Sequence, residues 1–237
     1  MTCLSVNINK VATLRNARGG NIPDVQIFAR RCEQSGADGI TVHPRPDQRH
    51  ITHRDVLLLK DIVTTELNIE GNPQPEFLQL VLEAHPRQVT LVPDAAEQLT
   101  SNHGYDTIRE HDFLLPIVRR LQSEGIRVSL FINPEAEMVE GAKRLGADRV
   151  ELYTGPYAEL YEVNKNEAVR LYESAAYKAK ELKIGLNAGH DLNMNNLAPF
   201  HKAFPWIAEV SIGQALIADA LYYGIDKTIQ MYKQQLV

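Results

Sequence analysis

Short runs that alternate apolar and polar side chains recur along the chain, each bounded by turn-forming residues. Alternation with a period of two is typical of β-strands, whose successive side chains point to opposite faces of a sheet. Stretches with helical periodicity lie between the runs. The pattern predicts strands over residues 4–9, 39–44, 66–71, 88–93, 127–133, 149–154, 183–187 and 209–213, and helices over residues 23–34, 52–63, 75–84, 107–123, 135–145, 166–182, 195–204 and 214–223.

Local signals mark several of these boundaries. Thr52 and Asp55 have the spacing of a capping box at a helix start. Gly36, Gly125 and Gly146 each follow a helical stretch and precede a strand. Glycine adopts the left-handed conformation that ends many helices, so each is expected to be a helix stop.

Strand and helix alternate throughout, which is typical of parallel strands joined by crossover helices. Eight units of roughly 30 residues match the usual size of a closed barrel. We therefore expect an α/β fold, a (β/α)8 TIM barrel, in a single domain over residues 1–237. The alternative is an open doubly wound sheet, which needs a glycine-rich turn after its first strand, and residues 7–10 contain no glycine.

The polar residues of the predicted strands share one parity. Helices cover the outside of a parallel barrel, so this parity must point into its interior, where most barrels carry aliphatic side chains. Such a lining favours a ligand-binding interior near the strand ends over a hydrogen-bonded polar core. The polar set comprises Asn7, Asn9, Thr41, His43, Asn68, Glu70, Ser129, Asn133, Glu151, Asn187 and Ser211.

Four titratable groups lie at or just after the ends of different predicted strands. His43 follows the second strand, Glu70 the third, Glu151 the sixth and His190 the seventh. Barrel enzymes place their chemistry at this end of the strands. Carboxyl and imidazole groups gathered there can exchange protons near neutral pH, as carbonyl, imine and dehydration chemistry requires.

Candidate anion-binding groups occur on two sides of the predicted mouth. Arg15 and Arg18 are expected in a loop after the first strand, and Arg45, Arg49 and His50 follow the second. The segments 187–190 and 211–214 follow the seventh and eighth strands, where barrels commonly hold phosphate on backbone N–H groups at a helix start. Two separated sites predict two phosphorylated small-molecule substrates.

Composition narrows the range of partners. The net charge of −5 comes without a basic run, so we expect no nucleic acid, and no apolar window is long enough to predict a membrane span or a secretory signal. Two cysteines, Cys3 and Cys32, are too few for a disulfide scaffold, and the simplest expectation is a cytoplasmic protein with reduced thiols. His50-x-x-His53 has no third soft ligand nearby, so no metal site is predicted.

Six segments carry a resemblance to a known family: 12–19 (ATLRNARG), 38–43 (DGITVH), 49–52 (RHIT), 91–93 (LVP), 128–132 (VSLFI) and 187–190 (NAGH). In these segments the chain resembles the pyridoxine 5'-phosphate synthases of the deoxyxylulose-phosphate-dependent route to vitamin B6. The resemblance runs from Val6 to about Tyr223.

The resemblance implies a (β/α)8 barrel with extra helices that assembles as a homo-octamer built from dimers. It implies condensation of 3-amino-2-oxopropyl phosphate with 1-deoxy-D-xylulose 5-phosphate, with release of inorganic phosphate and water and no organic cofactor. It assigns His43 and Glu70 as proton acceptors, His190 as proton donor, Glu151 as a group acting on intermediates, Asn7 and Arg18 as ligands of the amino ketone phosphate, and Arg45, His50 and Thr100 as ligands of the deoxyxylulose phosphate.

Four further substrate-binding positions differ from the family pattern. Asn9 and Lys10 stand where the family carries Asp-His, Asp191 stands where glycine follows the histidine, and the usual Gly-His pair is Gly213-Gln214. None of these is a proton-transfer residue, so we expect retained activity with a retuned phosphate site.

Two other functions fit the same pattern. A different phosphosugar lyase or isomerase on this barrel needs only one phosphate site. A non-catalytic barrel that binds phosphorylated metabolites is favoured by the altered positions Asn9, Lys10, Asp191 and Gln214.

Overall fold

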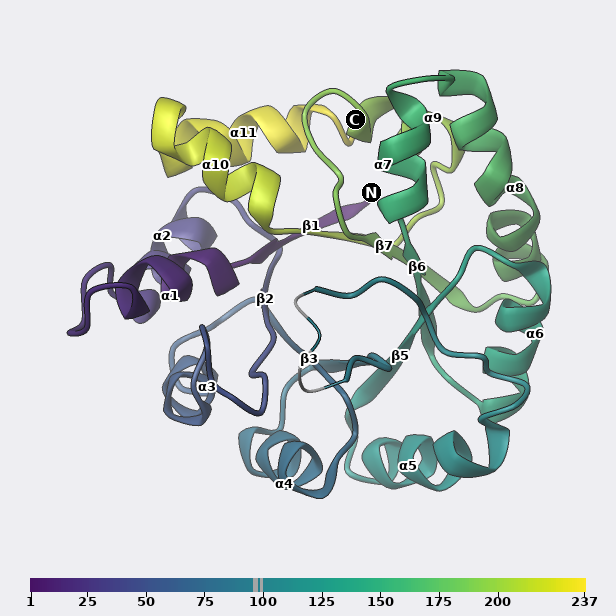
Figure 1. Cartoon of the computed structure of the whole chain (residues 1–237), viewed down its shortest axis with the longest axis horizontal. Coiled ribbons are helices and arrows are strands. Elements are labelled where there is room, and N and C mark those ends of the chain that lie inside the picture. The colour runs from purple at the N-terminus through teal and green to yellow at the C-terminus, as the bar shows by residue number, and fades with distance from the viewer. Residues whose placement is uncertain (96–97, 99) are drawn as a thin grey trace.

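Eight parallel strands pair in chain order, and β8 pairs with β1 to close the barrel, as predicted (Figure 1). The computed structural model describes residues 1–95, 98 and 100–237. The strands are β1 (Cys3–Asn7), β2 (Gly39–Val42), β3 (Glu66–Gly71), β4 (Gln88–Leu91), β5 (Arg127–Ile132), β6 (Arg149–Tyr153), β7 (Gly185–Gly189) and β8 (Glu209–Ile212).

The helices form a layer around the barrel (Figure 1). The eight predicted helices are present as α2 (Val25–Gln34), α3 (His53–Lys60), α4 (Pro75–Ala84), α5 (His111–Ser123), α6 (Ala136–Leu145), α8 (Lys165–Glu181), α9 (Leu197–Ala203) and α10 (Gln214–Tyr223). Three more are α1 (Asn9–Asn16), α7 (Gly155–Tyr161) and α11 (Ile225–Gln234). Within the described ranges, no helix has the length and apolar character needed to cross a membrane.

The predicted helix boundaries have the expected chemistry. Thr52 caps α3 in a full capping box, because its hydroxyl accepts the Asp55 N–H while the Asp55 carboxylate accepts the Thr52 N–H. Gly146 ends α6 with a φ of 81°, a conformation that side chains with a Cβ resist.

Several boundary predictions are wrong; β2 and β4, for example, each end two residues before the predicted end. The first strand ends at Asn7, two residues early, and the segment predicted as a loop starts with α1, whose N-cap Ile8 has no capping side chain. The seventh strand begins at Gly185 rather than residue 183, because Lys183 has a φ of 51° and therefore cannot extend the strand.

The predicted division of apolar and polar side chains is confirmed in the strands. Val6, Ile40 and Ile69 are fully buried in the apolar core beneath the helices. On the opposite parity, the Ser5 and Thr41 hydroxyls lie 2.6 Å apart and the Asn68 amide donates to Thr41 across 3.3 Å. The middle of the barrel is therefore a hydrogen-bonded polar core, which was the alternative to a ligand-binding interior.

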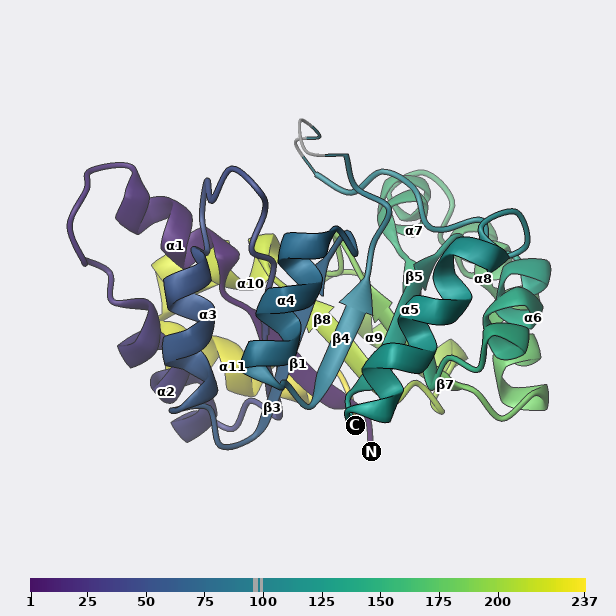
Figure 2. The ribbon, with the colours of Figure 1, turned by 90° about the horizontal axis from the view of Figure 1, so that it is seen from below.

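Charged groups close the end of the barrel that carries the strand starts. Arg127 pairs with Glu66 and donates to Gln88, and Arg149 donates to Glu209 across 3.0 Å. The chain termini lie at this end, and the arrow of β4 points away from them (Figure 2). We call the opposite end, where the strands finish, the mouth.

Candidate active site

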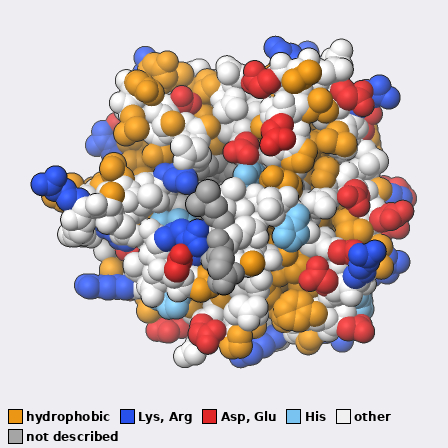
Figure 3. Space-filling model, viewed as in Figure 1, with side chains coloured by type: hydrophobic (Ala, Val, Ile, Leu, Met, Phe, Trp, Pro, Cys, Tyr) orange, Lys and Arg blue, Asp and Glu red, His pale blue; other side chains and the backbone are white. Residues whose placement is uncertain are grey.

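A cavity of about 570 Å³ occupies the mouth of the barrel. Lys, Arg and His side chains gather around the centre of this face (Figure 3). The lining residues are Asn7, Asn9, Lys10, Thr13, His43, Arg45, Arg49, His50, Glu70, Val92, Thr100, Ser101, Phe131, Glu151, His190, Asp191, Ser211, Gly213 and Gln214.

Every residue predicted for catalysis or substrate binding lines this cavity, with the exceptions of Arg15 and Arg18. Arg18 is exposed in the segment between α1 and α2. Asn133 is also misplaced by the parity prediction. It follows β5, and its side chain accepts the Gly104 N–H instead of facing the barrel interior.

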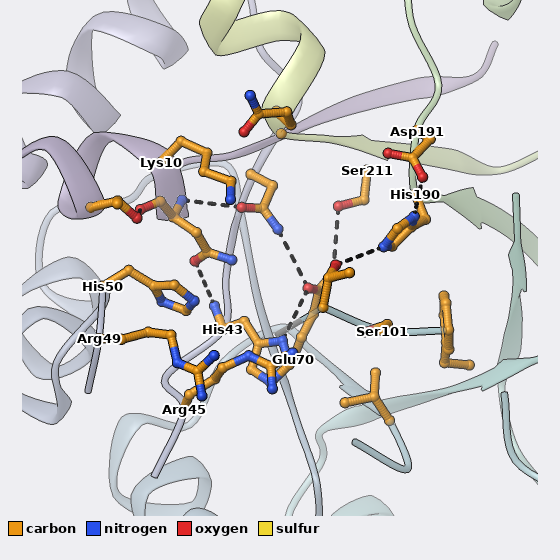
Figure 4. Close-up of a pocket in the computed structure, with 18 of the residues that line it drawn as sticks. Lys10, His43, Arg45, Arg49, His50, Glu70, Ser101, His190, Asp191 and Ser211 are labelled. Atoms are coloured by element: carbon orange, nitrogen blue, oxygen red, sulfur yellow. Dashed lines mark hydrogen bonds and ion pairs between the residues drawn. The ribbon is translucent and has the colours of Figure 1, made fainter. Parts of the chain in front are cut away.

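Glu70 stands at the centre of a polar cluster formed by three strands (Figure 4). The Asn7 amide donates to one carboxyl oxygen and the Ser211 hydroxyl approaches the other, each across 3.4 Å. His43 Nδ1 lies 4.0 Å from Glu70 Oε2. The imidazole and the carboxyl group are thus close enough for a proton to pass between them through a substrate atom or water.

Burial sets the protonation of this pair. It lowers the pKa of His43 well below its usual range, and the nearby Arg45 adds to the effect. It also raises the pKa of Glu70 to about 8, with further contributions from Asp94 and Glu209. Near neutral pH the pocket therefore holds a neutral imidazole beside a protonated carboxylic acid.

Glu151 lies deeper than Glu70 and is 3% exposed. Its carboxyl oxygen accepts a hydrogen bond from Thr90 across 3.4 Å. Burial, followed by the neighbouring Glu70, raises the pKa of Glu151 well above its usual range. Two acidic groups in one cavity thus hold protons that exposed glutamates release.

One side of the pocket is basic and carries the predicted ligands of the deoxyxylulose phosphate. Arg45 forms a buried ion pair with Asp94 and donates to the Gln98 carbonyl across 2.8 Å. His50 Nδ1 accepts the Ile51 N–H, so the other ring nitrogen carries the proton of the neutral ring. Burial and Arg45 lower the pKa of His50 to about 4.

Lys10 and Asn9 project from the first turn of α1. The Lys10 ammonium extends into the pocket (Figure 4), and it makes no hydrogen bond or ion pair with the described residues. Asn9 accepts the His43 N–H across 2.9 Å and so fixes the backbone at the end of β2.

The opposite side of the pocket contains the ends of β7 and β8. Gly213 is the N-cap of α10, so the first N–H groups of that helix face the mouth. A Cβ at Gly213 would lie 3.2 Å from Asn7, which shows how closely β8 approaches β1 here. His190 follows β7, and its Nε2 lies 3.0 Å from the Thr100 hydroxyl.

Arg15 is not an anion-binding group, which corrects the sequence interpretation. Its guanidinium makes a two-pronged ion pair with Asp55 at 2.6 and 2.8 Å and also donates to the His50 carbonyl. Both side chains are nearly buried. The sequence shows that Arg15 is charged but not which group it pairs with. In the structure its partner is Asp55, which belongs to the capping box of α3.

The sequence interpretation missed several lining residues. Ser101 and Phe131 line the cavity. Asp94 does not line it but forms the ion pair with Arg45. Asp94 follows Pro93 at the end of β4, so its position after a strand was a usable signal. In the described part of the chain, no group of three or more His, Cys, Asp or Glu side chains is arranged to hold a metal ion.

The family model described as "Pyridoxal phosphate biosynthesis protein PdxJ" matches residues 4–237. This chain belongs to the PdxJ family. It is 58% identical over 236 residues to the pyridoxine 5'-phosphate synthase of Cytophaga hutchinsonii, covering 100% of this chain and 99% of that one. The enzyme of the same name from Bacteroides fragilis is 58% identical, and that from Flavobacterium johnsoniae 52%, each over 100% of both chains.

Solved structures with low sequence identity share the PdxJ barrel. A 4-hydroxy-2-oxoglutarate aldolase/2-deydro-3-deoxyphosphogluconate aldolase has a TM-score of 0.64 at 16% identity, over 99% of this chain and 94% of that one. A thiamine phosphate pyrophosphorylase from Pyrococcus furiosus has a TM-score of 0.62 at 11% identity, over 99% and 95%. At these identities the likeness concerns the fold alone.

Proposed function

We propose that this chain is a pyridoxine 5'-phosphate synthase. It would condense 3-amino-2-oxopropyl phosphate with 1-deoxy-D-xylulose 5-phosphate, releasing inorganic phosphate and water. The observation that carries the proposal is the full-length match to the PdxJ family. A single cavity that holds acid–base groups between two anion-binding sides supports it.

The two substrates take opposite sides of the cavity. Arg45, His50 and Thr100 bind the deoxyxylulose phosphate, with Lys10 as an additional cation. The amino ketone phosphate is held by Asn7 and by the N–H groups at the start of α10, with Gly213, Gln214 and Asp191 beside it. Arg18 joins this site if the segment between α1 and α2 closes over the mouth.

The reaction moves protons repeatedly at neighbouring atoms. The amine attacks a ketone, the carbinolamine loses water, phosphate leaves, and an enamine carbon closes on the second carbonyl. Holding both substrates in one cavity makes the carbon–carbon step effectively unimolecular. Each well-placed acid or base then contributes roughly 10²–10⁴-fold.

The protonation states assign an order to the roles. Neutral His43 is ready to accept a proton from the substrate amine. Glu70 begins as an acid, because its pKa of about 8 keeps the proton on near neutral pH. It becomes a proton acceptor only after it has delivered that proton, for example to the departing hydroxyl. His190 donates from the opposite side, and protonated Glu151 hydrogen-bonds to oxygens of the intermediates.

The direct test is to incubate the purified protein with both phosphorylated substrates and to detect pyridoxine 5'-phosphate. Product formation is the expected result. Turnover of one phosphosugar without condensation favours a lyase or isomerase, and binding of both ligands without product favours a non-catalytic barrel. Either outcome would overturn the proposal.

Two variants test the assigned roles. Glu70→Gln and His190→Asn keep the shape of each side chain and are expected to leave folding and phosphate binding nearly intact while turnover falls by orders of magnitude. A variant that keeps most of the wild-type turnover contradicts the role of the residue it replaces.

Three further properties remain proposals: the assembly rests on the family resemblance, the single domain on the unbroken alternation of strands and helices, and the cytoplasmic location on the two cysteines and the lack of a signal pattern. We propose that the chain forms a single domain, that it assembles as a homo-octamer built from dimers, and that it acts in the cytoplasm. Sedimentation equilibrium of the purified protein tests the assembly, for which a dimer as the largest species is the contrary result.

A further inference from the structure

The two residues after β7 form a closely coupled pair. His190 and Asp191 both have left-handed backbones, with φ values of 88° and 58°. This fold turns the Asp191 carboxylate back onto the preceding imidazole, and Oδ2 lies 2.7 Å from His190 Nδ1 (Figure 4). Two consecutive residues in a region that non-glycine residues seldom occupy are strained, and such strain concentrates at functional sites.

Neighbouring side chains hold this strained turn in place. The Thr154 hydroxyl lies 2.6 Å from the carbonyl oxygens of both Gly189 and His190. The amides of Asn193 and Asn196 donate to the Asp191 carbonyl across 3.3 and 3.2 Å. The turn is thus fixed by the residue that follows β6 and by the segment before α9, so the carboxylate stays beside the ring.

The pair determines which nitrogen of the His190 ring exchanges protons. An ionised carboxylate only accepts hydrogen bonds, so His190 Nδ1 must carry a hydrogen in the neutral and in the cationic ring. Nε2, beside Thr100 at the mouth, is left as the atom that gains and loses a proton. Tyr153 packs edge-on against the ring, with centroids 5.1 Å apart.

We propose that Asp191 is a positioning residue for His190, which holds the imidazole in the Nδ1–H form and aims Nε2 at the bound substrates. The proposal rests on the proposed function, in which His190 is the proton donor. The His190 ring also lowers the pKa of Asp191, so this carboxylate is ionised near neutral pH. The hydrogen bond with His190 Nδ1–H turns this negative charge toward the ring.

Two variants separate the charge of Asp191 from its shape. Asp191→Asn keeps the shape and removes the charge, and Asp191→Gly removes the side chain. Asparagine and glycine both tolerate positive φ, so the turn is retained. The matched control is Asp112→Asn, which removes the carboxylate from another adjacent pair, His111 and Asp112, at 3.2 Å on α5, far from the cavity.

We expect each Asp191 variant to lower kcat by about 10- to 100-fold, the loss that corresponds to one charge-assisted hydrogen bond. KM for both substrates is expected to change by less than about twofold, since the residue acts through His190. The titratable groups that face the ring among the described residues are Asp191 and Tyr153.

A readout that does not depend on turnover keeps the test valid if the proposed function fails. Nitrogen-15 NMR of the His190 ring should show the Nδ1–H form in the wild type and in Asp112→Asn, and a shift toward the Nε2–H form in Asp191→Gly. An unchanged ring spectrum in Asp191→Gly overturns the proposal, as does a wild-type kcat in both Asp191 variants. A rise in KM for the amino ketone phosphate at constant kcat also overturns it, because Asp191 would then contact substrate directly.

Discussion

Replacing Glu70 by glutamine should change how the stability of the protein depends on pH. The Glu70 side chain is only 13% exposed. Its burial, followed by the nearby negative charges of Asp94 and Glu209, raises its pKa from 4.5 to about 8. Glutamine has nearly the same shape as the protonated acid but cannot ionise, so Glu70→Gln removes this titration from the folded state.

The sign and size of the effect follow from proton linkage. Between pH 4.5 and about pH 8 the unfolded chain loses the Glu70 proton while the folded protein keeps it. The contribution of Glu70 to the free energy of unfolding is therefore fully present below pH 4.5, and it is lost as the pH rises toward 8. A rise of about 3.5 in pKa, at about 1.36 kcal/mol for each pKa unit, corresponds to a loss on the order of 5 kcal/mol.

This figure is an upper limit for the Glu70 share, because Glu151 lies in the same cavity and its protonation responds to the Glu70 charge. The comparison therefore uses the difference between the wild-type and Glu70→Gln plots of unfolding free energy against pH, and not the slope of either plot alone. Removing Glu70 also removes one cause of the raised pKa of Glu151, which makes the plot of the variant flatter still.

Urea unfolding at intervals from pH 5 to pH 8.5 measures the effect. Relative to the wild type, Glu70→Gln should gain several kcal/mol of unfolding free energy across this range. Glu173→Gln, which replaces an exposed glutamate on α8, is the control and should track the wild type. Parallel curves for Glu70→Gln and the wild type would refute the reasoning, since they would mean that Glu70 ionises alike in both states.

Three other substitutions have definite expected outcomes. Asp55→Asn breaks the buried pair with Arg15 and should lower the unfolding free energy by about 3–5 kcal/mol in urea titrations; a loss below about 1 kcal/mol contradicts this. Asp94→Asn leaves its buried guanidinium partner without a counter-charge and should raise KM for the deoxyxylulose phosphate more than it changes kcat, whereas an unchanged KM opposes it. Gly189→Ala places a Cβ 2.2 Å from Glu151 Oε1, so it should displace that carboxyl group and cut turnover by at least about tenfold in steady-state assays, and full activity would be the contrary result.

The sequence was sufficient to predict the barrel and the parity of its strands, because both follow from local periodicity. The eight helices that cover the barrel were equally visible. The remaining three were missed for separate reasons. The start of α1 lacks a capping side chain, α7 has only seven residues, and α11 follows α10 after Gly224 with no strand between them.

The sequence predicted which residues form the candidate site, but not which of them contact one another. Strand ends meet at one mouth, so His43, Glu70 and Glu151 could be grouped from their positions alone. Ion pairing depends on distances between segments, which the sequence does not contain. It therefore could not show that Asp94 holds Arg45.

The tie between α1 and the capped start of α3 has a consequence for how mutational surveys of this protein should be interpreted. Arg15 does not line the cavity itself, yet its guanidinium donates hydrogen bonds to the carbonyl of the lining residue His50 and to the Asp55 carboxylate. Losing it would loosen the backbone beneath a phosphate ligand. A screen that measures only vitamin production would group Arg15 with the catalytic residues, although its contribution is structural.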